Sequence, residues 1–324
     1  MTKAIRIYEI GGPEVLKWED VAVGEPGAGE VRLKHTAIGL NYIEVYQRTG
    51  LYKITDFPAT IGSEAGGVIE AVGDDVTDFK VGDRVTYAMN IGAYSEARTM
   101  STDKLVHVPD GIDDNVAGGM MLQGMTAYYL LHKTYPVKAG DTILIYAAAG
   151  GVGLIMCQWA KLLGATVIGC VGSEEKAELV KANGCDYPIL YRDESVSERV
   201  KEITGGEGVP VVYDSIGKST FMDSLDCLRP EGVMTTFGNA TGTVEPFPMG
   251  ILAAKGSLYV TRPTLATHTA TRERLEECAA ALMGVVESGQ VKVTINQTYA
   301  LEDAAKAHID LEARKTSGSS VLLP

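Results

Sequence analysis

The chain has 324 residues, 45% of them hydrophobic and 22% charged, a composition typical of a globular chain long enough for about two domains. Its formal net charge is −13 and it contains no Lys/Arg run, which argues against nucleic-acid or anionic-membrane partners. No apolar run approaches the ~18 to 20 residues that span a bilayer, and the start lacks the layout of a signal peptide, so we expect a cytoplasmic protein. The five cysteines are scattered and never spaced as C-x-x-C, which indicates reduced thiols.

The first third of the chain shows short, frequent β signals. Residues 4–10 alternate between apolar and polar, and 31–40 give another strand after a Gly/Pro-rich turn. Residues 41–48 predict a short helical segment. The densest glycine pattern, 62–73, lies within β signals and indicates bulges and close backbone approach. Together these features predict a compact, barrel-like β domain.

A helix predicted over Val116 to Lys133 leads out of this region, with a domain boundary after residue 124. From Asp141 to about Pro263 strands and helices alternate strictly, which predicts a parallel sheet covered on both faces. The expected strands, enough for a complete doubly wound unit, are 142–147, 165–171, 187–190, 209–213, 232–237 and 257–261.

The remaining residues predict a helix over 271–288, a β segment over 291–298, a helix over 301–314 and a last strand over 320–323. Such a tail extends a parallel sheet poorly, so we expect it to return to the N-terminal domain. The predicted fold is therefore α/β, with a Rossmann sheet (125–263) inserted in a discontinuous, β-rich, barrel-like domain (1–124 and 264–324).

The predicted strand over residues 143–147 runs into a small-residue turn, which is followed by apolar residues at helical spacing. A strand, a glycine turn and a helix in this order are the context of a dinucleotide-binding fingerprint, in which backbone N–H groups approach a pyrophosphate. Alanine replaces the first glycine and weakens the motif taken alone, but the flanking elements restore it. The expected contacts are Ala148, Gly150, Gly151, Val152 and Gly153.

The end of the second strand selects the cofactor, because an acidic residue there favours NAD and small or basic residues accommodate NADP. Here the strand ends in Gly172 and Ser173, with Lys176 one helical turn later, so a 2'-phosphate is accommodated and NADPH is predicted. Glu174 and Glu175 leave NADH open, since either side chain turned inward opposes a phosphate. The alternative is a solvated first helical turn, where acids are favourable anyway.

Tyr191 and Arg192, at the end of the third strand, are candidates to stack on or pair with the same ribose-phosphate. Arg192 is alternatively part of a surface ion pair with the acids that follow it. None of the five histidines is spaced from a carboxylate or cysteine as a metal ligand is, so no zinc site is predicted. Without a Lewis acid to stabilise an alkoxide, we expect reduction of an acceptor that is already electrophilic.

The chain resembles the zinc-free quinone oxidoreductase branch of the medium-chain dehydrogenase/reductase superfamily, whose catalytic domain is GroES-like. The resemblance runs nearly end to end and rests on GGPEVL (11–16), AIGLNYIEVYQRTGLY (37–52), GSEAGGVIEAVG (62–73), VGDRV (81–85), AAAGGVG (147–153) and VVYDSIG (211–217). The zinc-dependent relatives carry His in place of Ser63 and a Cys ligand near Asn41, and they have a four-cysteine lobe that this chain lacks.

The resemblance implies site residues that the motifs alone do not give. It places Asn41, Tyr46 and Tyr52 at the nicotinamide and substrate cleft between the domains, and Arg262 near the mouth of the active site. Along the dinucleotide it places Gln123, Thr126, Ser215, Phe237, Gly238 and Asn239. It also implies a homodimer formed through the edge strand 257–260. Asn41 is alternatively a helix N-cap, and the two tyrosines are alternatively amphipathic rings that simply cap the cleft.

These features predict an NADPH:quinone oxidoreductase that transfers hydride without a metal. One alternative is an NADPH-dependent enone or alkenal double-bond reductase, because the same cleft can present a C=C bond. An alternative of another class is a non-catalytic, NADPH-binding structural or RNA-binding protein of the crystallin kind, which the acidic charge disfavours.

Overall fold

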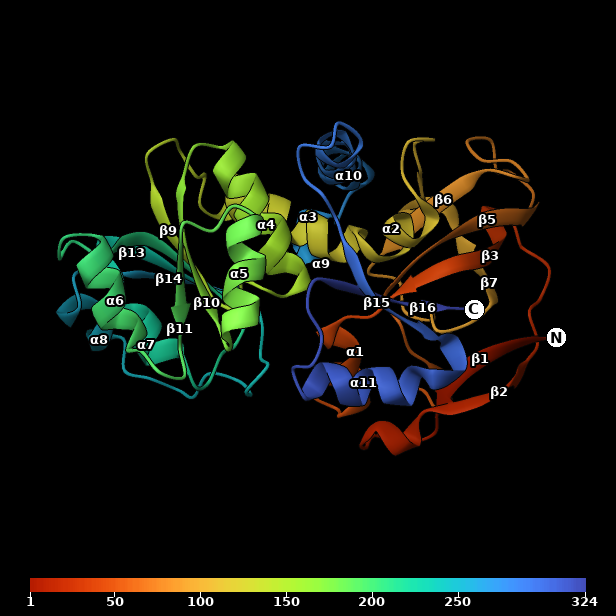
Figure 1. The fold of residues 1–324 in the computed structure, drawn as a ribbon. Coiled ribbons are helices and arrows are strands. Elements are labelled where there is room, and N and C mark those ends of the chain that lie inside the picture. Colours follow the sequence, from red (N-terminus) through yellow and green to blue (C-terminus); the bar gives the residue numbers. More distant parts are fainter. The chain divides into compact units, whose positions relative to one another are not determined.

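The computed structural model describes residues 1–324, which form two compact units (Figure 1). The first unit contains residues 1–125, 269–288 and 293–324, and the second contains 126–268 and 289–292. The first unit is thus assembled from segments at both ends of the chain. The observed divisions lie one and five residues from those expected after residues 124 and 263.

The strands of the first unit pair antiparallel, except that β15 and β16 are parallel. One sheet has three strands in the order β2-β1-β4, and a larger one runs β15-β16-β3-β5-β6-β8, with β7 also paired to β3. The strands are β1 (Thr2–Ile7), β2 (Lys17–Val21), β3 (Glu30–Gly39), β4 (Ala59–Thr60), β5 (Glu64–Val72), β6 (Arg84–Ala88), β7 (Ala97–Ser101), β8 (Val106–His107), β15 (Ile295–Ala300) and β16 (Ser319–Leu323). The expected return of the C-terminal segment is visible in the pairing of Val321 with Gly39 (Figure 1).

Short helices connect and cover these strands. They are η1 (Pro13–Val15), α1 (Tyr42–Arg48), η2 (Thr102–Lys104), α2 (Asp114–Gly119), α10 (Arg272–Glu287), η4 (Leu301–Asp303) and α11 (Ala304–Glu312). The core of the unit is apolar and joins strand residues such as Ile5, Leu33 and Tyr87 to Ala304 of α11. Burial of this one apolar side of the strands is what the alternating sequence pattern predicts.

The second unit contains a six-stranded parallel sheet in the order β11-β10-β9-β12-β13-β14. Its strands are β9 (Thr142–Ile145), β10 (Thr166–Val171), β11 (Tyr187–Leu190), β12 (Val209–Asp214), β13 (Leu228–Thr236) and β14 (Tyr259–Thr261). This is the strand order of a complete doubly wound dinucleotide-binding sheet, so the predicted α/β fold class is confirmed.

Helices cover both faces of this sheet, with α4 and α5 on one side and α6 and α7 on the other (Figure 1). The helices are α4 (Gly151–Leu162), α5 (Glu174–Ala182), α6 (Val196–Ile203), α7 (Phe221–Asp226), α8 (Gly250–Ala254) and α9 (Leu265–His268). The strands are therefore buried on both sides, as the continuous apolar runs Ile143–Ile145 and Val209–Tyr213 indicate. None of the helices in the chain combines the length and apolar character that crossing a bilayer requires.

The single helix expected over residues 116–133 is wrong. The chain forms α2, then α3 (Met121–Tyr129) and then a π-helical turn, η3 (Leu130–Thr134), with a break at Met120. Close packing of α2 on the sheet accounts for the early end, because a methyl group on Gly118 would lie 2.5 Å from the carbonyl oxygen of Ala37. A continuous helical pattern carries no sign of such a contact.

Candidate active site

The glycine turn between β9 and α4 has the geometry of a dinucleotide-binding turn. The strand ends at Ile145, two residues earlier than expected, and Ala147 takes a left-handed conformation with φ of 51°. Gly150 is the N-cap of α4. A methyl group on Gly153 would lie 2.4 Å from the carbonyl oxygen of Ala147, so only glycine fits between helix and turn.

Ala148 occupies the position of the missing first glycine. It is fully buried, its N–H donates to the carbonyl of Cys170 at 3.1 Å, and its methyl group faces Gly169 on β10. A methyl group on Gly169 would lie 2.9 Å from that of Ala148. The neighbouring strand thus provides the glycine that this close contact requires, at Gly169, so the turn can close although residue 148 is alanine. Gly151 and Val152, in the first turn of α4, remain partly exposed.

The ends of β10 and β11 bring the predicted phosphate-selecting residues together. Ser173 is the N-cap of α5, and its Oγ accepts from the N–H of Lys176 at 3.3 Å, which leaves its own hydrogen to donate. A methyl group on Gly172 would lie 2.9 Å from the hydroxyl of Tyr191, so this phenol packs over the glycine. These residues form a small polar cluster of suitable chemistry for a phosphate.

The two acidic residues that left the cofactor open, Glu174 and Glu175, are both exposed in the first turn of α5. Carboxylates are favourable there because the helix dipole places positive charge at the N-terminus. Their placement agrees with the alternative of a solvated first turn and gives no sign of a carboxylate directed at the cluster.

The loops that follow β12 and β13 touch each other at Ser215 and Gly238, two of the residues predicted to contact the dinucleotide. A methyl group on Gly238 would lie 2.2 Å from the carbonyl oxygen of Ser215, so the two loops touch through backbone alone. Phe237 precedes this contact, and its N–H donates to the carbonyl of Asp214 at 2.8 Å. Arg262 joins the same group, because its Nη1 donates to the carbonyl of Gly238 at 3.2 Å.

The side-chain amide of Asn239 completes this cluster. With its nitrogen directed at the carbonyl of Gly238, its oxygen accepts from Nη2 of Arg262, each at 3.0 Å. The resemblance placed Arg262 near the active-site mouth and Asn239 along the dinucleotide. The structure brings the two into direct contact within the second unit.

Asp214, at the end of β12, is a site residue that sequence reasoning missed. Its carboxylate is fully buried and accepts from four donors: the N–H groups of Ile216 (2.6 Å) and Gly217 (3.1 Å) and the hydroxyls of Thr220 (2.6 Å) and Ser224 (2.9 Å). It therefore fixes the loop that contains Ser215. The signal in the sequence was an acid at the end of an apolar strand, where a carboxylate commonly caps the following turn.

Asn41 and Gln123, predicted to lie near the nicotinamide, are in direct contact within the first unit. Nε2 of Gln123 donates to Oδ1 of Asn41 at 3.0 Å, and Nδ2 of Asn41 donates to Oε1 of Glu64 at 2.7 Å. Glu64 is completely buried, and burial raises its pKa from 4.5 to about 7. Sequence reasoning did not single out Glu64, because nothing in its glycine-rich segment distinguishes it from a surface acid.

Asn41 is also the N-cap of α1, as its alternative interpretation predicted. Its N–H donates to Oε2 of Glu44 at 2.7 Å. The other oxygen of Glu44, Oε1, has no hydrogen-bond partner, and burial raises the pKa of this carboxyl from 4.5 to about 8. Two fully buried carboxyl groups thus flank one asparagine.

The predicted tyrosines stack edge to face, with the ring centroids of Tyr46 and Tyr52 5.2 Å apart. Tyr46 is 8% exposed and Tyr52 37%, so Tyr46 is buried and Tyr52 is the more accessible ring of the pair. Thr126, also predicted, is buried on α3 and begins the second unit.

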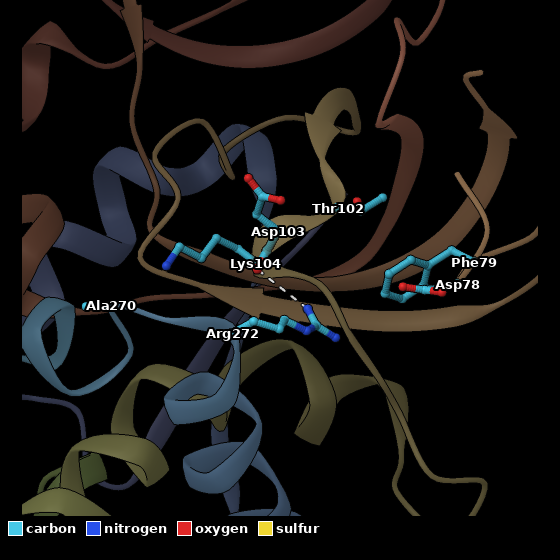
Figure 2. A pocket seen from close by; sticks show the side chains of 7 residues that line it. All are labelled: Asp78, Phe79, Thr102, Asp103, Lys104, Ala270 and Arg272. Carbon is cyan, nitrogen blue, oxygen red and sulfur yellow. Dashed lines mark hydrogen bonds between the residues drawn. The ribbon is translucent and has the colours of Figure 1, made fainter. Parts of the chain in front are cut away.

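No group of three or more His, Cys, Asp or Glu residues is arranged to hold a metal ion. A cavity of about 550 Å³ in the first unit is lined by residues of the loop after β5, of η2 and of the start of α10, namely Asp78, Phe79, Thr102, Asp103, Lys104, Ala270 and Arg272 (Figure 2). It contains none of the predicted site residues. The two cationic side chains in its lining are hydrogen-bonded to backbone carbonyls: Lys104 donates to Thr269, and Arg272 donates to Leu105.

The second unit has a doubly wound sheet, a glycine turn and a polar cluster at the end of its second strand, and the first is a separate barrel-like β unit. Together these features define a nicotinamide-dependent oxidoreductase. Comparison with known proteins agrees. The family described as alcohol dehydrogenase GroES-like domain matches residues 27–141, and the family described as zinc-binding dehydrogenase matches 151–283.

Relatives match along the whole chain. A quinone oxidoreductase of Pseudomonas aeruginosa is 52% identical over 100% of both chains, and a 2-haloacrylate reductase of a Burkholderia species is 47% identical over 100% of this chain and 99% of its own. The structure of Escherichia coli quinone oxidoreductase complexed with NADPH superposes with a TM-score of 0.97 at 46% identity, covering 99% of this chain and 100% of that one. The chain belongs to the quinone oxidoreductase branch of the medium-chain dehydrogenase/reductase superfamily.

Proposed function

We propose that the protein is an NADPH:quinone oxidoreductase. The observation that carries this assignment is full-length similarity to quinone oxidoreductases, one of them solved with NADPH, together with a phosphate-compatible cluster at the cofactor-selecting strand end. The net reaction consumes a quinone, NADPH and a proton and yields a hydroquinone and NADP⁺.

The residues present fit this cofactor. The N–H groups at the start of α4 are aligned for a pyrophosphate, and the close approach at Gly153 leaves no side chain in their way. Ser173, Lys176 and Tyr191 would hold the 2'-phosphate. When bound, NADPH supplies the hydride, and the protein's contribution is to orient the reactants and exclude water.

On the acceptor side we assign Asn41, Tyr46, Tyr52 and Arg262 to binding and orientation of the substrate. Amide N–H, phenol and guanidinium groups all donate hydrogen bonds, which is what a carbonyl oxygen gaining negative charge requires. An electron-poor quinone gives a phenolate-like product that water can protonate. No side chain is therefore required as a general acid.

A second candidate activity is reduction of a conjugated C=C bond, and the similarity to a 2-haloacrylate reductase favours it. The test is the rate of NADPH oxidation, followed by absorbance at saturating cofactor, over a series of quinones and a series of enones and 2-haloacrylates. We expect quinones to give the higher kcat/KM. A higher value with the conjugated acids would replace the first activity with the second, and tight NADPH binding without turnover of any acceptor would favour a non-catalytic role.

The cofactor assignment has its own test in the variant Lys176→Ala. Loss of a charge-assisted contact of about 1.5–3 kcal/mol predicts an NADPH affinity ~10 to 100-fold weaker, with NADH affinity unchanged. Lys181→Ala is the matched control, because Lys181 lies on the same helix and pairs with Glu178 at the surface. Equal weakening of both cofactors by Lys176→Ala would contradict the assigned 2'-phosphate contact.

We further propose that the protein forms a homodimer through β14. This strand ends the order of the six-stranded sheet, so its outer edge carries unpaired backbone groups, and Tyr259 on it is 62% exposed. Light scattering on Val260→Pro, which cannot donate to a strand partner, is expected to give a monomer where the wild type gives a dimer. The cytoplasmic location stays a prediction.

A further inference from the structure

Four side chains from distant parts of the sequence form one buried chain of hydrogen bonds in the first unit. Oγ of Ser319 donates to Oε1 of Gln123 at 2.6 Å, Nε2 of Gln123 donates to Oδ1 of Asn41 at 3.0 Å, and Nδ2 of Asn41 donates to Oε1 of Glu64 at 2.7 Å. Each of the four residues is 6% exposed or less. Water is therefore not available to replace any of these partners.

The direction of this chain is set at one end. Both oxygens of Glu64 act as acceptors, since Oε2 also accepts from the N–H of Leu122 at 2.7 Å. A carboxylate has no hydrogen to give, so the amide of Asn41 must turn its nitrogen toward Glu64. The oxygen of that amide then faces Gln123, whose side-chain nitrogen must donate to it. While Glu64 is ionised, its charge therefore sets the orientation of every later group in the chain.

Burial raises the pKa of Glu64 to about 7, and hydrogen bonds from Leu122 and Asn41 oppose this shift, so the carboxylate is the form present above about pH 7. The donor Leu122 lies in the first turn of α3, where the helix dipole stabilises negative charge. Gly39 provides the space, because a methyl group there would lie 2.2 Å from Oε1 of Glu64. The carboxyl of Glu44 accepts from the backbone N–H of Asn41, and the backbone N–H of Glu44 faces the Asn41 side chain in the capping box. Glu64 is thus the one carboxyl group that contacts the Asn41 amide itself.

We propose that Glu64 is a positioning residue, which orients the Asn41 amide so that its second N–H hydrogen is the group left to donate to the carbonyl oxygen of the acceptor. This inference rests on the proposed function, in which Asn41 binds the acceptor. A reversed amide presents an oxygen lone pair at the same place, and an oxygen repels the charge that develops on the acceptor during hydride transfer.

The variant Glu64→Gln tests the proposal because it reverses the chain without breaking it. The new glutamine keeps its oxygen on the N–H of Leu122 and turns its NH₂ toward Asn41. Asn41 must then offer its oxygen, and its nitrogen faces Gln123. Gln123 turns in the same way and donates to the hydroxyl of Ser319, which accepts as readily as it donates. All hydrogen bonds are made, so we expect a folded protein of nearly unchanged Tm.

We expect the variant to lower the turnover number and to leave the affinity for NADPH nearly unchanged. Glu64→Gln should lower kcat for quinone reduction by about 10 to 100-fold, the order of effect seen when one donor to a developing oxyanion is lost. The dissociation constant of NADPH should stay within about twofold. Glu70→Gln is the matched control: it makes the same substitution on the same strand, at a partly exposed ion pair with Arg32 outside the site, so its kcat should equal that of the wild type.

A second pair of variants separates orientation from charge and stability. Gln123→Glu alone places carboxylates at both sides of Asn41, where they compete for one amide nitrogen, so its Tm should fall. Adding Glu64→Gln removes the conflict and restores Tm, and this double variant has the net charge of the wild type. Its amide chain is still reversed, so kcat should stay low.

Recovery of kcat together with Tm in the double variant would overturn the proposal, as would wild-type kcat in Glu64→Gln. If the single Glu64 variant were poorly folded, the double variant would still decide between the two outcomes. Absence of quinone turnover in the wild-type protein would instead refute the proposed function, and with it the role of Asn41 toward the acceptor. Recovery of Tm in the double variant would show even then that the chain has the direction described.

Discussion

The glycine turn offers the most direct test of the cofactor site through the variant Gly153→Ala. The added methyl carbon would lie 2.4 Å from the carbonyl oxygen of Ala147, 2.5 Å from that of Ala148 and 2.7 Å from the carbonyl carbon of Ala148. All three are backbone atoms, so no side chain can rotate away. Reaching an ordinary contact distance of about 3.4 Å requires the turn and α4 to move apart by about 1 Å, and overpacking of this kind costs about 1–3 kcal/mol.

We expect a lower Tm and a larger loss in NADPH affinity, because the N–H groups that meet the pyrophosphate move with the turn. Thermal unfolding and fluorescence titration with NADPH measure the two effects. Gly284→Ala is the matched control: Gly284 lies inside α10 with no atom within 4 Å of an added methyl group, so alanine there should stabilise the helix by up to about 1 kcal/mol. Unchanged NADPH affinity in Gly153→Ala would refute the role assigned to the close approach.

Three further predictions concern buried polar groups. Arg48 is fully buried and donates to Glu312 at 2.6 Å and to the carbonyl of Gly11 at 2.7 Å, so Arg48→Leu should lower the free energy of unfolding by about 2–4 kcal/mol. Urea titration measures this change, and Lys3→Ala, at an exposed ion pair, is the control that should change it by less than about 0.5 kcal/mol. Burial raises the pKa of Glu44 from 4.5 to about 8, so the folded state holds this proton more tightly than the unfolded chain. The stability that this group contributes is fully present below pH 4.5 and is lost as the pH rises through 8. A urea series over pH 5–9 should therefore show a flatter dependence of the free energy of unfolding on pH in Glu44→Gln than in the wild type. Asp214→Asn should weaken NADPH binding with little effect on the affinity for quinone, because the loop that this carboxylate fixes contains the predicted contact Ser215; equal loss of both affinities would contradict this.

The fold followed from sequence to a large extent because it depends on periodic burial. Apolar runs bounded by turns predicted all six strands of the parallel sheet, with ends that differ by a few residues. The break at Met120 was missed because it results from a glycine packing on a strand 81 residues earlier, as the contact of Gly118 with Ala37 shows. The replacement of the first turn glycine by Ala148 was recognised, but its compensation by Gly169 depends on strand pairing and is visible only in three dimensions.

The candidate site was predictable where a motif fixes the backbone and unpredictable where side chains meet across the fold. Ser173 and Lys176 are three residues apart, so local spacing was enough to pair them. Glu64 reaches Leu122 across 58 residues, and Gln123 reaches Asn41 across 82. Neither separation leaves a pattern in a single sequence, and Glu64 is an acid in a strand segment that composition alone assigns to the surface.

Both units orient polar groups with the same device, a buried carboxylate whose partners in the structure are neutral donors. Asp214 accepts from four donors close to it in the sequence, so it fixes a loop that is already nearly formed by the local backbone. Glu64 accepts from donors distant in the sequence, Leu122 and Asn41 among them, and it orients two amides and a hydroxyl in turn. An amide can satisfy the same neighbours in either of two directions, whereas a loop has one closed form. A neutral substitution should therefore loosen the loop at Asp214 but reverse the chain at Glu64, and only the second change can alter the chemistry while the fold stays intact.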